Sequence, residues 1–190
     1  MGLLHQSGRR SRASRSRGAE IMEFCLVLLP FLAMVTALVD GSWAVFAKAT
    51  LQRAVRIGVR VGITLTSAQM AQGACLTDTV KGIVQSNSMG LLGSGTGASN
   101  YALIKVHYFQ PPATGSASAS TDVSANSDGD QPGNIVQVSV QSYSVVPLLP
   151  RIFNWKTAVD KNPLVIQGVY AADLIEPASS TVRPCIGTAP

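Results

Sequence analysis

A long apolar run near the N-terminus is the strongest pattern in the chain. From Phe24 to Val39 the residues FCLVLLPFLAMVTALV are interrupted only by Thr36. Together with their apolar neighbours they exceed the roughly 20 residues that a helix needs to cross a bilayer. We therefore expect a transmembrane segment at about 21–45. Pro30 lies inside it, and membrane helices tolerate proline better than soluble helices do.

The helix need not end where the apolar run ends. The sequence KATLQRAVRIGVRVGITL follows without a strong breaker, so we expect one helix over 19–65 that lies in lipid first and is amphipathic afterwards. Arg53, Arg56 and Arg60 share one face, because they are three and four residues apart. They either meet lipid headgroups or acids of a neighbouring subunit, or they form a solvated face. Apolar residues can cover much of the rest: Leu51, Ala54, Val55, Val61 and Leu65.

The remaining segment, 66–190, combines helical and strand-like patterns. An apolar stripe predicts a second helix from about Ser67 to Gln85. Alternation of apolar and polar residues predicts three strands, at 101–109, 134–146 and 164–172. Residues 111–133 are almost wholly small and polar, and we expect a disordered loop there. The predicted fold class is α+β, with a long N-terminal transmembrane helix that becomes amphipathic, a second helix and a small antiparallel sheet.

The positive charge of the chain is concentrated at its N-terminus. The formal net charge is +5, and five arginines lie within the first 18 residues, with no acid among them. Beyond residue 18 ten basic residues balance ten acidic ones, which argues against nucleic-acid binding by the body. We interpret residues 1–18 as a disordered cytoplasmic leader, because basic flanks favour the cytoplasmic side of a membrane. The segment 66–190 would then be exported.

Acidic and aromatic residues stand where the leader meets the apolar run. Gly18, Ala19 and Glu20 are followed by Glu23 and Phe24. Taken alone, the glutamates are explained by the positive end of the helix dipole. A basic leader, a glycine, a glutamate five residues later and an adjacent aromatic residue also resemble the cleavage signal of type IV prepilins. The match is closest to the tight-adherence (Flp/Tad) branch, although Phe24 replaces the tyrosine of that motif.

The resemblance extends to the TadE-like minor pseudopilins of that pilus. Their N-terminal region has Arg-Gly, Val-Glu-Phe, an apolar run with proline, an Asp-Gly element, Leu-Gln and Ala-Arg-x-Gly-x-Arg. The counterparts in this chain are RGAEIMEF, LVLLPFLAMV, Asp40 with Gly41, Leu51 with Gln52, and AVRIGVRVG. The order of these elements is the same, which makes the resemblance specific. The rest of the chain matches only loosely.

This resemblance implies a processing site and an assembly site. A prepilin peptidase would cut between Gly18 and Ala19 at the cytoplasmic face, so the leader would be lost. Glu23, next to Phe24, would act as a charge anchor that faces the N-terminal amine of a neighbouring subunit. Pairing is required because a charge in a low-dielectric environment is costly when it is alone.

Asp40 and two cysteines are further candidates. Asp40 lies near the far end of the span, where an ionisable residue is a functional candidate. Alternatively, it simply sits at the outer interface or caps a break at Gly41. Cys25 lies in the apolar run. Cys75 and Cys185 either form a disulfide in the exported segment or are free buried thiols. Closing such a long loop would contribute about 4 to 5 kcal/mol in the chain-entropy model.

The sequence offers no recognisable catalytic or cofactor site. His5 lies in the leader, and His107 lies on the polar face of a predicted strand without a serine or cysteine motif. We find no phosphate loop, no metal-ligand spacing and no calcium loop. We therefore expect a protein that is not an enzyme and that needs no cofactor or metal.

The resemblance implies a minor pilin-like structural subunit of a tight-adherence pilus or a related secretion system. Its expected partners are the prepilin peptidase, other pilin and pseudopilin subunits, the inner-membrane assembly platform and the lipid bilayer. It would lie in the bacterial inner membrane as a single-pass protein, with a cytoplasmic N-terminus and a periplasmic body, and could enter an extracellular pilus. The alternative is a membrane-anchored periplasmic binding or scaffold protein. A secreted enzyme cut near Ala47 to Ala49 is weaker, because the apolar run is too long for a signal peptide.

Overall fold

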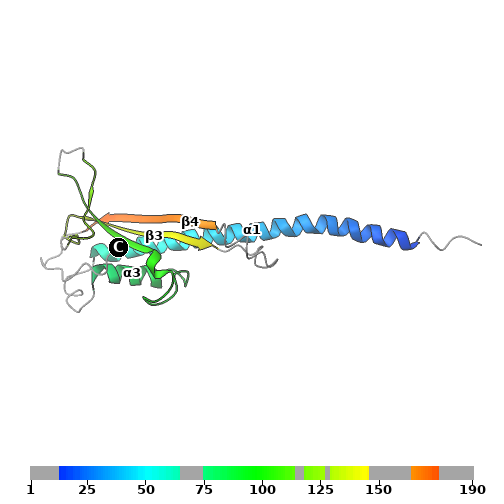
Figure 1. Ribbon diagram of the computed structural model, residues 1–190, viewed down its shortest axis with the longest axis horizontal. Coiled ribbons are helices and arrows are strands. Elements are labelled where there is room, and N and C mark those ends of the chain that lie inside the picture. Colours follow the sequence, from blue (N-terminus) through cyan, green and yellow to red (C-terminus); the bar gives the residue numbers. More distant parts are fainter. Residues whose placement is uncertain (1–12, 65–74, 114–117, 127–128, 146–163, 176–190) are drawn as a thin grey trace, which may run out of the picture.

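One very long helix dominates the computed structural model, which describes residues 13–64, 75–113, 118–126, 129–145 and 164–175. Helix α1 (Ala13–Thr64) projects from a small body as a rod (Figure 1). It passes through Pro30 without a break, so the prediction of one long helix is confirmed. The helix begins at Ala13 and not at 19, so the end of the predicted leader is not disordered. Alanine and arginine are good helix formers, and residues 13–18 contain no proline.

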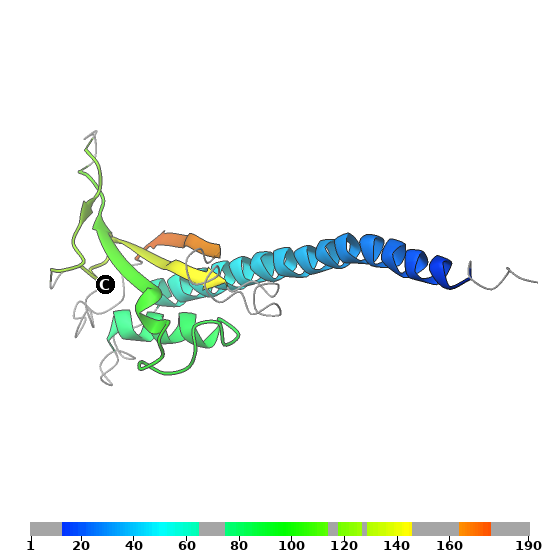
Figure 2. The same ribbon diagram turned by 45° about the vertical axis from the view of Figure 1, so that its right-hand side comes forward.

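The two halves of α1 have different surroundings. The side chains of the apolar run are exposed, for example Phe24 at 63% and Leu38 at 62%. From Ala47 onward one face of the helix is buried, and Leu51, Ala54 and Val55 have no exposed surface. Figure 2 shows the same division, because the body lies only against the C-terminal half of α1.

The body contains a four-stranded antiparallel sheet in the order β2-β1-β3-β4. The predicted strands are confirmed, and the observed bounds are β1 (Ile104–Gln110), β3 (Ile135–Val145) and β4 (Leu164–Leu174). A short 3-10 helix, η1 (Tyr101–Leu103), precedes β1 where the sequence predicts strand. The apolar positions of neighbouring strands face each other, as at Val106 with Val138 and Val140 with Val169.

Helix α3 (Leu76–Ser86) packs beside α1 on one side of the sheet. The predicted start at Ser67 lies outside the described residues, but Cys75 is extended, so the helix is not continuous from 67 to 85. A Cβ atom on Gly58 would overlap the side chain of Val84, which shows how closely the two helices approach. The core is formed by α1, α3 and the inward face of the sheet, and its largest buried side chain is Tyr108.

Part of the polar segment 111–133 is ordered, contrary to the expectation of a disordered loop. Thr121 and Asp122 form strand β2 (Thr121–Asp122), which pairs with the end of β1. The N–H of Val123 donates to the carbonyl of Tyr108 at 2.8 Å, and Ser124 is buried. These small polar residues are held by hydrogen bonds to β1, a type of order that an apolar pattern does not reveal.

Candidate functional site

The predicted processing junction lies on the exposed part of α1. Gly18, Ala19 and Glu20 are all exposed and helical, and a Cβ atom on Gly18 would meet nothing within 4 Å. Apart from proline, glycine is the residue that favours a helix least, so Gly18 weakens the helix in this turn. Glu23 and Phe24 follow on the next turn, and both are exposed.

Two acidic residues lie on the apolar half of α1 at opposite ends. Within the part of the chain that the structure describes, Glu23 forms no ion pair or side-chain hydrogen bond. Asp40 is half-buried and does have an interaction partner. The helix runs through Asp40 and Gly41 without interruption, so a cap at a helix break is wrong for this residue. The apolar half of α1 is long enough to cross a membrane, and no residue of its most apolar 18-residue window is buried inside the protein.

The three arginines beyond the apolar half lie on an exposed face, as their spacing predicts. Arg53, Arg56 and Arg60 line a shallow groove together with Ala49, Gln52 and Ile57. None of the three forms an ion pair with a side chain in the described ranges. A second groove lies nearer the N-terminus of α1 and is almost wholly apolar, with Trp43 and Phe46 stacked at 5.6 Å between ring centroids.

The cysteines have two different chemical states. Cys75 is disulfide-bonded, whereas Cys25 is a free thiol on the exposed part of α1. Cys185 lies outside the described residues, so its pairing with Cys75 stays a prediction. Cys75 immediately precedes α3, so the disulfide is attached to the chain at the start of this helix.

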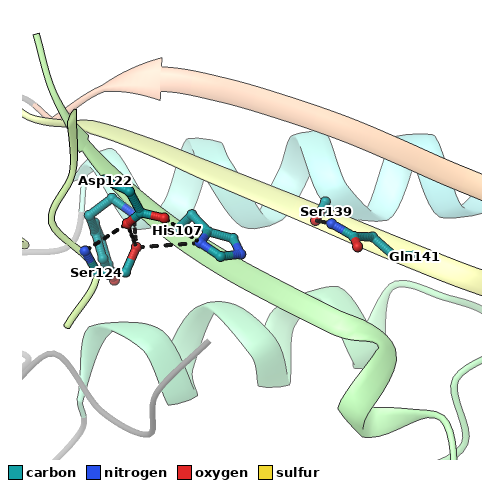
Figure 3. Close-up of polar contacts among 6 residues, drawn as sticks. His107, Asp122, Ser124, Ser139 and Gln141 are labelled. Carbon is teal, nitrogen blue, oxygen red and sulfur yellow. Dashed lines mark hydrogen bonds and ion pairs between the residues drawn. The ribbon is translucent and has the colours of Figure 1, made fainter. Parts of the chain in front are cut away.

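A histidine, an aspartate and a serine meet where β2 joins β1 (Figure 3). His107 Nδ1 lies 3.1 Å from Asp122 Oδ2 and 3.5 Å from Ser124 Oγ. The Ser124 hydroxyl donates to Asp122 Oδ1 and accepts from the N–H of Tyr108 at 2.8 Å. These contacts lower the pKa of Asp122, mainly through the hydrogen bond from the Ser124 hydroxyl.

This cluster does not have the geometry of a catalytic triad. Ser124 and Asp122 approach the same ring nitrogen of His107, whereas a relay needs one partner on each nitrogen. The serine proton is used in the bond to Asp122, and Ser124 is only 7% exposed. The cluster therefore holds β2 against β1. The strand pattern predicts His107 on the polar face, but no pattern marks Asp122 and Ser124, because they lie in a segment without periodicity.

Lys81 on α3 is a second polar feature that no sequence pattern marks. Its side chain is 6% exposed, and its Nζ lies 6.0 Å from the ring centroid of Tyr101. The pKa of Lys81 is lowered, first by burial and then by the positive charge of Lys105, while Asp78 acts in the opposite direction. The aliphatic stem covers apolar surface, a structural role that is common for lysine.

No cluster of three or more potential metal ligands occurs among the residues that the structure describes.

Comparison with known proteins points to the same segment. Residues 18–60 match the family model of TadE-like proteins, so this part of the chain is similar to that family and the predicted resemblance is confirmed. The family is related to the Tad pilus and is a pilin-like structural family, not a family of enzymes. No curated protein and no solved structure is significantly similar to the chain. The matched segment begins at the predicted cleavage site and ends at Arg60.

Proposed function

We propose that this TadE-like chain is a minor pilin-like structural subunit that takes part in assembling a tight-adherence (Flp/Tad) pilus or a related secretion system. The main support for this proposal is the apolar half of α1, because its large apolar side chains are exposed all around the helix. Apolar surface of this extent must be covered by lipid or by other helices. The family match lies on the same helix.

The first part of the proposal is processing. A prepilin peptidase cuts between Gly18 and Ala19 at the cytoplasmic face of the inner membrane, and the body lies on the periplasmic side. The exposure of this turn and the weak helix propensity of Gly18 support it, because a protease must locally unwind its substrate. Cutting removes all five leader arginines and creates a free amine on Ala19.

The second part is the charge anchor. In hydrocarbon a lone carboxylate costs roughly 2.5 to 3.5 kcal/mol near the centre of a helix and less near its end. Glu23 is exposed on the helix and lacks an ion-pair partner within the described ranges, so a neighbouring subunit can supply one. The new amine on Ala19 of that neighbour is the partner that the proposal assigns.

The deciding experiment is the mass of the mature chain, purified from cells with an active prepilin peptidase. We expect a chain that begins at Ala19. Retention of Met1 would overturn the processing step and favour a plain membrane-anchored binding or scaffold protein. A start near Thr50 would instead indicate a secreted protein and would also overturn the proposal.

The anchor is tested by two matched substitutions, Glu23→Ala and Glu20→Ala. Both glutamates are exposed, and they lie on neighbouring turns of the same helix. We expect both variants to be cut, while only Glu23→Ala fails to enter the assembled pilus or its membrane complex. Equal incorporation of the two variants contradicts a special role for Glu23.

A further inference from the structure

The two shallow grooves on α1 lie on the same side of the helix and follow each other along it. The apolar groove is lined by Val35, Leu38, Val39, Ser42, Trp43 and Phe46. The basic groove is lined by Ala49, Gln52, Arg53, Arg56, Ile57 and Arg60. The first ends three residues before the second begins, so there is less than one helical turn between them.

A heptad pattern connects the two grooves. Val35, Val39, Ser42 and Phe46 are spaced by four, three and four residues, and the alternation continues to the next groove. There the positions are Ala49, Arg53, Arg56 and Arg60. We call these eight residues the seam. Its apolar section runs from Val35 to Phe46, and its basic section runs from Ala49 to Arg60. At 100° per residue they fall within an arc of about 100°, which is the width of a helix-binding stripe.

The seam faces away from the body. All eight of its side chains are exposed, whereas Leu51, Ala54 and Val55, on the other side of the same helix, are completely buried. Ser42 does not interrupt the apolar section, because its hydroxyl donates to the carbonyl of Leu38 at 2.7 Å. A second helix can therefore lie along the whole seam without meeting the sheet or α3.

The basic section extends past the lipid headgroups. At 1.5 Å per residue, Arg56 and Arg60 lie about 15 Å and about 21 Å beyond Phe46 along the helix axis. The headgroup layer on each side of a bilayer is only about 5 to 8 Å thick. Lipid phosphates can therefore reach Lys48 and the start of the basic section, but they do not account for Arg56 and Arg60.

A second copy of the chain is also a poor partner for the seam. If two copies pack in parallel and in register, the three arginines of one face the three of the other, and like charges at such positions repel. A partner with carboxylates at these heights removes the repulsion and pairs the arginines. The seam thus favours a different subunit over an identical one.

From these observations we infer that the seam binds a single-span helix of another subunit. The apolar part of this partner helix lies against Val35 to Phe46. Its carboxylates lie two to four turns beyond Phe46, opposite Arg53, Arg56 and Arg60. The inference rests on the proposed function in one respect, that α1 spans a membrane. It deepens that function by stating the chemistry of the neighbour, which must be apolar in the membrane and acidic just outside it.

The test uses the full chain in phosphatidylcholine vesicles together with synthetic single-span peptides. Each peptide has a leucine and alanine span followed by two heptads whose seam positions are all glutamate or all lysine. Energy transfer from a dye on the body to a dye on the peptide measures binding. We expect the glutamate peptide to bind about tenfold more tightly than the lysine peptide at low salt, and the preference to shrink as salt rises.

Charge reversal on the chain supplies the controls. The triple variant Arg53→Glu, Arg56→Glu, Arg60→Glu should reverse the preference, and Arg56→Glu alone should reduce it about threefold. Lys48→Glu is the matched control, because Lys48 is exposed on the same helix but off the seam, and it should leave the preference unchanged. Circular dichroism verifies that each variant is folded.

Four results would overturn the inference. They are equal binding of the two peptides, an unchanged preference in the triple variant, loss of the preference when phosphatidylglycerol is added, and self-association of the chain as tight as its binding to the glutamate peptide. The last two would assign the seam to lipid or to a second copy. The assay uses the uncut chain, so failure of cleavage at Gly18 leaves it unaffected, and its own failure leaves the cleavage result standing.

Discussion

The close contact between α1 and α3 predicts opposite effects of one substitution at two glycines. Gly58 faces Val84 so closely that a Cβ atom would overlap that side chain. Gly82, in the middle of α3, has nothing within 4 Å of its Cβ position. We expect Gly58→Ala to destabilise the body and Gly82→Ala to stabilise it.

The magnitude follows from two opposing terms. Alanine is favoured over glycine in a helix interior by about 1 kcal/mol, and this gain applies at both positions. Overpacking a core costs typically about 1 to 3 kcal/mol, and it applies only at Gly58. Val84 is fully buried and is stiff about its first side-chain torsion, so it has little freedom to move aside. The two variants should therefore differ by about 1 to 3 kcal/mol in the free energy of unfolding.

The assay is a urea titration of the full chain in detergent, read out by pulse proteolysis of the body. Val84→Ala, made alone and with Gly58→Ala, completes a double-mutant cycle. The methyl group at position 58 then fills space that Val84 has vacated, so the cycle should show a favourable coupling of about 1 kcal/mol or more. If Gly58→Ala is as stable as Gly82→Ala, or if the coupling is absent, the helices are not in the close contact described above.

Three further predictions concern the body. Ser124→Ala should raise the pKa of Asp122 toward its ordinary value, as measured by carboxyl NMR shifts, because the hydroxyl hydrogen bond is the main cause of the lowering. Since this pKa is lowered on folding, the stability due to Asp122 is complete above about pH 4 and is lost on further acidification, and Asp122→Asn should remove this dependence. Thr77→Val should lower the free energy of unfolding by about 1 kcal/mol in urea titrations, because it removes the hydrogen bond between Thr77 and the buried Tyr108 hydroxyl. Thr77→Ser should lower it less. Cys75→Ser should cost about 2 to 5 kcal/mol, and Cys185→Ser should have the same effect with no further loss in the double variant, if the two cysteines pair.

The elements that the sequence predicts well are those with a strong apolar period. Helix α1 follows from its apolar run and the absence of a breaker, and β3 follows from the alternation of Val136, Val138 and Val140, all of which are buried. The alternation shifts at Ser142, whose φ of 59° is unusual for a serine, and Val145 is buried afterwards. The register of the strands and the face that α1 covers are tertiary properties, and a local pattern does not determine them.

The candidate site is predicted only in part, for a physical reason. Gly18 and Glu23 are visible because a family motif marks them, and the arginine face is visible from its helical spacing. The contacts of His107 with Asp122 and Ser124 link two strands across a polar segment, where no apolar residue signals order. Lys81 interrupts the apolar stripe of α3 and is nevertheless buried, since its stem is apolar and only its end is charged.

The way the body covers α1 has a consequence for biogenesis. Strand β4 packs against α1, yet 100 residues separate Thr64 from Leu164 along the chain. At roughly 5 to 20 residues per second, synthesis of this interval takes roughly 5 to 20 s. During that time α1 has been synthesised without the strand that packs against it. Helix α1 is thus complete well before the sheet that covers its C-terminal half, and a chaperone for the body would have to act within this interval.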